Sequence, residues 1–98
     1  METIHNFKDL VSYIDNYVNG GVYMTREFRG DITTEYLVLN VRRDFDYYQY
    51  PFTIRKSTRG KICYFYDGMF YFNEHQLVNE MYIDLKKKGI FNKNRWRY

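Results

Sequence analysis

The apolar residues of this chain change their spacing twice, and that change limits the possible folds more than any single motif does. In residues 6–18 and 73–88 they recur every three or four positions, as on one face of a helix. From residue 22 to residue 72 they alternate at every second position, as in the strands of a sheet. We therefore predict an α+β fold: an N-terminal helix, a four- to five-stranded antiparallel β-meander, a C-terminal helix and a short basic-aromatic tail.

The strand region contains one strong turn signal and one strand-edge signal. Asp67-Gly68 separates two aromatic segments, and an Asp-Gly pair is typical of a two-residue hairpin because both positions take positive φ. Pro51 has no N–H to donate to a ladder. We therefore expect its strand, residues 48–55, to be an edge strand or to carry a bulge at Pro51.

The two helices have recognisable ends. Asn6 and Asn73 can cap the first turns, and Gln76 can return a hydrogen bond to the second cap, as in a capping box. Residues 19–21 (Asn-Gly-Gly) should end the first helix and Gly89 the second, because glycine accepts the left-handed conformation common at helix ends.

The composition predicts a core built largely from aromatic rings. The 98 residues fit one domain, 1–98 with a tail at 90–98, and 21% of them are aromatic. Buried tyrosine hydroxyls need partners, so we expect many tyrosines to lie half in the core. The single cysteine excludes an intramolecular disulfide. The absence of an 18-residue apolar run and of a secretory signal predicts a cytoplasmic protein without a membrane partner.

Charge is segregated along the chain. Residues 42–61 contain six basic and two acidic residues, and residues 86–98 contain six basic residues and no acid. Residues 62–85, by contrast, contain four acidic residues and no lysine or arginine. This segregation predicts a basic patch, although the net charge of +3 is small for a dedicated polyanion-binding protein.

The side chains capable of catalysis or metal binding are few and lack a recognisable pattern. The candidates are His5, His75, Cys63, Glu35, Asp44 and Asp46. Two histidines without paired cysteines do not make a zinc site, and a nucleophilic cysteine needs a base that the pattern does not supply. The Arg29-Gly30-Asp31 tripeptide is most simply a turn between strands. We therefore predict no enzyme activity and no cofactor.

Alternation divides the strand residues into an inner and an outer set. The inner set should face the helices: Leu37, Leu39, Tyr50, Phe52, Ile62 and Tyr64. The outer set should gather on the opposite face and contact a partner: Tyr23, Tyr36, Arg42, Tyr47, Arg55, Phe65 and Tyr71, with Lys61 at its rim. The C-terminal residues Arg95, Trp96 and Arg97 could extend this surface, or Trp96 and Phe91 could fold back onto the sheet.

Three interpretations of the outer set remain open at this point. Tyrosine and arginine are enriched at protein–protein hot spots. Aromatic rings interleaved with arginine also serve single-stranded nucleic acid, where rings stack on bases and cations contact phosphates. The outer face could instead be closed by the tail or by a second copy in a homodimer.

The small size, the lack of motifs and the Asn-, Lys- and Tyr-rich composition resemble small accessory proteins of phages and mobile elements. That resemblance implies a protein that binds and inhibits a host or defence protein, as anti-CRISPR proteins do. The expected function is therefore non-enzymatic binding of a protein partner, and a host enzyme that handles nucleic acid is one candidate for that partner. Direct binding of single-stranded DNA or RNA is the alternative.

Overall fold

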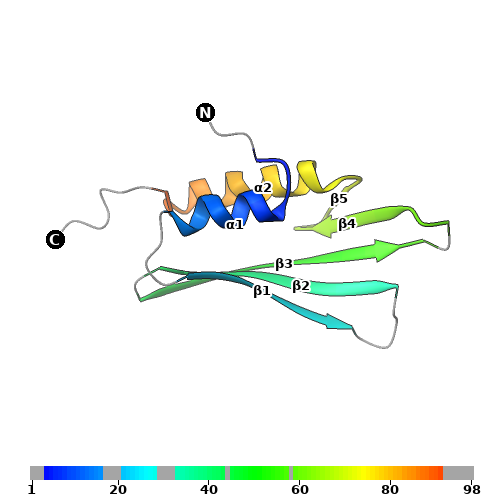
Figure 1. The fold of residues 1–98 in the computed structure, drawn as a ribbon, viewed down its shortest axis with the longest axis horizontal. Helices are drawn as coiled ribbons and strands as arrows, with labels where there is room; N and C mark the ends of the chain where they lie inside the picture. Colours follow the sequence, from blue (N-terminus) through cyan, green and yellow to red (C-terminus); the bar gives the residue numbers. More distant parts are fainter. Residues whose placement is uncertain (1–3, 17–20, 29–32, 44, 58, 92–98) are drawn as a thin grey trace.

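The computed structural model describes residues 4–16, 21–28, 33–43, 45–57 and 59–91. In chain order these residues form α1 (Phe7–Asp15), β1 (Gly21–Phe28), β2 (Thr34–Arg43), β3 (Asp46–Lys56), β4 (Ile62–Tyr66), β5 (Met69–Tyr71) and α2 (Glu74–Lys87). The strands make one antiparallel sheet in the order β1-β2-β3-β4-β5 (Figure 1). The predicted α+β fold is confirmed.

Two layers enclose the core. Both helices lie side by side over one face of the sheet (Figure 1). Their apolar stripes supply fully buried side chains such as Leu10, Ile14, Leu77 and Met81. The sheet contributes the predicted inner residues Leu37, Leu39, Tyr50, Phe52 and Tyr64, all buried. No described helix is long and apolar enough to cross a membrane.

The helix caps form largely as predicted. The Asn6 side chain accepts a hydrogen bond from the Asp9 N–H at 2.9 Å, and Asn73 accepts from the Gln76 N–H at 2.8 Å. The predicted return bond from Gln76 to Asn73 is wrong. The Gln76 Oε1 atom accepts instead from the N–H of Phe72 at 3.4 Å, because β5 ends one residue earlier and leaves that N–H outside the ladder.

The C-terminus of α2 is held by a buried arginine that the sequence did not reveal. Gly89 has φ +75°, as predicted for a helix stop, and the Ile90 N–H returns to the Leu85 carbonyl at 3.3 Å. Arg43, at the end of β2, is only 4% exposed. Its Nη1 atom donates to the carbonyls of Gly89 and Ile90 at 2.8 and 2.9 Å, so it ties the sheet to the end of α2.

The predicted hairpin and strand edge are confirmed. Asp67 and Gly68 have φ +50° and +80°, as a two-residue turn of this kind requires. Strand β4 pairs with residues 53–56 of β3 alone, so β3 has no partner on that side at Pro51 among the described residues. The predicted turn at residues 29–31 lies outside the described residues.

One prediction about an apolar residue is wrong, and one alternative is decided. Ile62 was expected in the core but is 40% exposed, because it is the first residue of β4 and lies at the end of the strand. Phe91, for which folding back onto the sheet was one alternative, instead packs its ring between Tyr13 of α1 and Tyr82 of α2, at centroid distances of 4.9 and 5.2 Å. Packing between the helices covers a ring that an extended tail would leave in water.

Candidate functional site

The face of the sheet opposite the helices, here called the outer face, is the candidate binding surface. Both helices lie on the other side (Figure 1). The strand register places most of the predicted partner-binding residues on the outer face: Tyr23, Tyr36, Arg42, Tyr47, Arg55 and Phe65. All six are exposed, although several are large hydrophobic side chains.

Exposed rings on the outer face form a row across the sheet. Tyr36 of β2 lies opposite Thr53 of β3, Thr53 lies opposite Phe65 of β4, and Phe65 lies opposite Phe70 of β5. We call these four residues the aromatic row. The rings of Phe65 and Phe70 are 5.1 Å apart, and Tyr36, Phe65 and Phe70 are 38%, 41% and 64% exposed. Because the strands hold these rings in register, they make a rigid apolar surface on the side of the sheet that no described helix covers.

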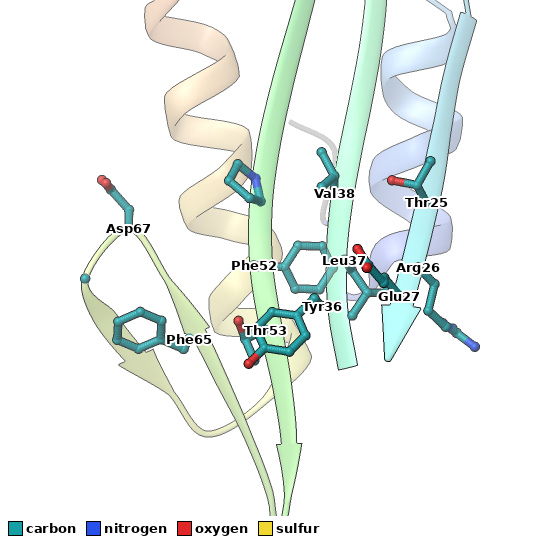
Figure 2. A pocket seen from close by; sticks show the side chains of 12 residues that line it. Thr25, Arg26, Glu27, Tyr36, Leu37, Val38, Phe52, Thr53, Phe65 and Asp67 are labelled. Atoms are coloured by element: carbon teal, nitrogen blue, oxygen red, sulfur yellow. The ribbon is translucent and has the colours of Figure 1, made fainter. Parts of the chain in front are cut away.

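The aromatic row borders two adjoining hollows. The larger, of about 550 Å³, extends from the row toward Thr25 and Val38 on one side and Asp67 on the other. The smaller, of about 250 Å³, extends toward Arg55 and Cys63. Figure 2 shows Tyr36 and Phe65 on the outer side of the sheet with Thr53 between them and the helices behind. The surface is therefore a shallow depression with aromatic walls.

One end of the outer face is strongly basic. Residues 55–61, which are the last two residues of β3 and the loop to β4, contain four cations and no acid. Arg55 and Lys61 border a further hollow of about 430 Å³, together with Ile62 and Phe72. Phe72 is 76% exposed. Lys61 thus lies at the rim, where the sequence placed it, and the cations surround apolar side chains.

The other end of the outer face is a hydrogen-bonded network centred on Asn40. Although it lies on the outer face, Asn40 is only 1% exposed. Its Oδ1 atom accepts from the Tyr47 hydroxyl at 2.6 Å and from Gln49 at 3.2 Å. The Tyr23 and Tyr47 hydroxyls are 2.9 Å apart, and this bond is the main cause that raises the pKa of Tyr23. Tyr23 and Tyr47 are therefore held in place by partners within the domain.

Tyr71 is wrongly assigned to the outer face. The two-residue turn at 67–68 pairs Tyr66 with Met69, so Phe70 lies opposite Phe65 and Tyr71 lies opposite Tyr64. Tyr71 is therefore on the inner face, half-buried and packed against the core. Phe70, which sequence reasoning missed, occupies the outer position. The signal was present, because the length of the turn determines the register of the strands it joins.

The remaining predicted residues are those of the C-terminal tail and the side chains considered for catalysis or metal binding. Arg95, Trp96 and Arg97 lie outside the described residues. Cys63 is a free, half-buried thiol on β4, directly opposite Arg55. The rings of His5 and His75 stack at 5.4 Å. Within the described ranges, no three His, Cys, Asp or Glu side chains are grouped so that they could hold a metal ion.

The chain matches no family model, no curated protein and no solved structure.

Proposed function

We propose that this protein is a non-enzymatic binding protein that contacts a partner protein through its outer face. The aromatic row carries the proposal, because it exposes three large rings in register on the face that no described helix covers. Aromatic residues and arginine dominate binding energy at interfaces. Arg55 lies beside the row and supplies a bidentate donor for a carboxylate or a carbonyl.

The scaffold supports binding because it limits the entropy lost on association. The rings of the row project from paired strands, and each has only two side-chain torsions to restrict. At the other end, the Asn40 network already fixes Tyr23 and Tyr47. A partner would therefore meet a surface that is largely arranged before contact.

In its concrete form, the proposal is inhibition of a host or defence protein by occlusion of a surface. The support for that form is the resemblance in size and composition to accessory proteins of phages and mobile elements.

The test is affinity purification from cells that naturally contain the protein. The Tyr36→Ser/Phe65→Ser variant removes two rings of the row, and Phe45→Ser removes a fully exposed ring in the β2–β3 turn as a matched control. We expect the wild type and the control to retain a partner that the double variant loses at least tenfold. Undiminished capture by a double variant that keeps the wild-type circular dichroism spectrum would contradict the proposal.

A second candidate function is binding of single-stranded nucleic acid. The cations of residues 55–61 beside the aromatic row favour it, since bases can stack on rings while phosphates contact cations. Fluorescence anisotropy with short oligonucleotides should then show an affinity that falls steeply with salt and with Arg55→Ala/Lys61→Ala. No binding at low salt would remove this candidate. Light scattering on the purified protein tests whether a second copy occupies the face instead.

A further inference from the structure

The basic end of the outer face contains cations that have no acidic neighbour. The side chains of Arg55, Lys56 and Lys61 border the hollow of about 430 Å³, and no described aspartate or glutamate borders it with them. All three residues are exposed, and none makes an ion pair with a described residue. We call these three residues the cation cluster. A hollow bordered by charges of one sign attracts groups of the opposite sign, so this hollow favours an anion.

Apolar side chains form the rest of the same hollow and connect it to the aromatic row. Phe72 is 76% exposed and Ile62 is 40% exposed. Arg55 and Cys63 border both this hollow and the smaller hollow that reaches the aromatic row. The cation cluster and the exposed rings therefore belong to one continuous surface. A ligand that matches this surface needs negative charge and apolar groups side by side.

Negative charge lies at the other borders of the aromatic row. Glu27 lies at the β1 end of the row, and Asp67 follows the end of β4 that is farther from the cation cluster. Both carboxylates are exposed and border the larger hollow, whereas Arg26, which borders it too, is paired with Glu35 at 3.3 Å (Figure 2). A nucleic acid strand carries a phosphate at every nucleotide and would meet these carboxylates on crossing the row. The charge pattern therefore suits a ligand whose negative charge is confined to one end.

We infer that the outer face recognises a protein segment whose carboxylates contact the cation cluster and whose apolar side chains continue onto the aromatic row. The inference rests on the proposed function and adds to it the chemistry and the direction of the bound segment. Arg55 can donate two parallel hydrogen bonds to one carboxylate. Arg55 and Thr53 are successive outer-face positions of β3, about 7 Å apart. An acidic residue of the segment and the apolar residue that reaches the row are therefore separated by about two positions in an extended chain.

The experiment is an NMR titration of the ¹⁵N-labelled protein with the peptide acetyl-Glu-Glu-Ser-Leu-Phe-Leu-amide. A control peptide has glutamine in place of both glutamates. We expect shifts at the amides of Arg55, Lys61, Phe65 and Phe72, and an affinity that falls as the salt concentration rises. The control peptide should bind roughly threefold to tenfold more weakly, as expected from the loss of two partly exposed ion pairs.

Protein variants test the charge of the cluster directly. Arg55→Glu/Lys61→Glu reverses two of its charges, and Lys86→Glu/Lys87→Glu makes the same change in net charge at two exposed positions of α2. We expect the first variant to lose the glutamate peptide and to bind a peptide with lysine in place of both glutamates. The second variant should bind as the wild type does. A purely structural role of the cation cluster would not produce this exchange of preference.

The outcomes separate this inference from the proposed function. Equal binding of the glutamate and glutamine peptides at the aromatic row would overturn the inference and support the outer face as a protein-binding surface. Tighter binding of a short oligothymidylate, shifts that depend on protein concentration alone, or no shifts at millimolar peptide would also overturn the inference. In those three cases the capture experiment with Tyr36→Ser/Phe65→Ser decides the proposed function separately.

Discussion

Replacing Arg43 with methionine should destabilise the domain strongly, because Arg43 is buried, unlike the exposed arginines of the same sheet. The arginine side chain is buried, and its Nη1 atom bridges the carbonyls of Gly89 and Ile90 just beyond α2. Methionine keeps much of the aliphatic volume but cannot donate. Two carbonyls at the end of a packed helix would then lose their charged donor.

The expected loss can be estimated from the two hydrogen bonds. A hydrogen bond to a charged group contributes about 1.5–3 kcal/mol, so two would contribute about 3–6 kcal/mol. Part of this is offset, because the variant no longer keeps a guanidinium out of water. We expect a net loss of about 2–3 kcal/mol in the free energy of unfolding. For a domain of this size, that corresponds to a fall in Tm of roughly 8–24 °C.

The measurement is urea and thermal unfolding followed by far-UV circular dichroism, with Arg42→Met as the matched control. Arg42 is the adjacent residue, but its side chain is exposed on the outer face, so its replacement should change stability by less than about 0.5 kcal/mol. Arg43→Lys should fall between the two, because one ammonium reaches both carbonyls less well. Equal, small effects of Arg42→Met and Arg43→Met would refute the assignment of Arg43 as the tie between β2 and α2.

The remaining predictions concern buried hydroxyls and the hairpin. Tyr66→Phe should cost about 1.5–3 kcal/mol by removing the hydrogen bond to Asp84, whereas Tyr50→Phe should be neutral or stabilising, since the buried Tyr50 hydroxyl has no partner among the described residues. Burial raises the pKa of Tyr50 to about 12, and burial with the Asp84 bond raises the pKa of Tyr66 further. Both pKa values exceed the value of about 10 that a tyrosine has in the unfolded chain. The contribution of these two hydroxyls to the free energy of unfolding should therefore be constant below about pH 10 and fall as the pH rises toward about 12. A urea midpoint that does not fall between about pH 10 and pH 12 would contradict this. Gly68→Ala should cost about 1–2 kcal/mol in the same assay through its φ of +80°, and an unchanged midpoint would show that this strain is absent.

Local signals in the sequence were sufficient to predict the fold. The change of period between helix and strand, the Asn6 and Asn73 caps and the Asp67-Gly68 turn each depend on neighbouring residues alone. Most of the outer face was also predictable, because alternation along a strand determines which residues share a face. Local rules of this kind transfer directly from sequence to structure.

The errors arose where a residue's environment depends on distant parts of the chain. Arg43 and Arg42 look alike in the sequence, and only the position of α2's C-terminus makes one of them a buried tie. Ile62 follows the inner pattern but lies at the end of its strand. Tyr71 differs from these, because its face depends on how β4 and β5 pair across the turn and not on alternation along either strand alone. The length and register of neighbouring strands and helices determine whether each of these three side chains is buried and which face it occupies.

The aromatic row of the outer face has its structural origin in the early end of β4. The turn at Asp67 and Gly68 ends β4 after Tyr66, and Pro51 would leave a longer β4 without a hydrogen-bond donor at that position. Two independent features of the sequence thus stop the pairing at the same place. One consequence is the short hairpin that brings Phe65 and Phe70 into the aromatic row. The other is that residues 47–51 of β3 have no partner strand on that side among the described residues, so a change that lengthened β4 would alter the row and this edge together.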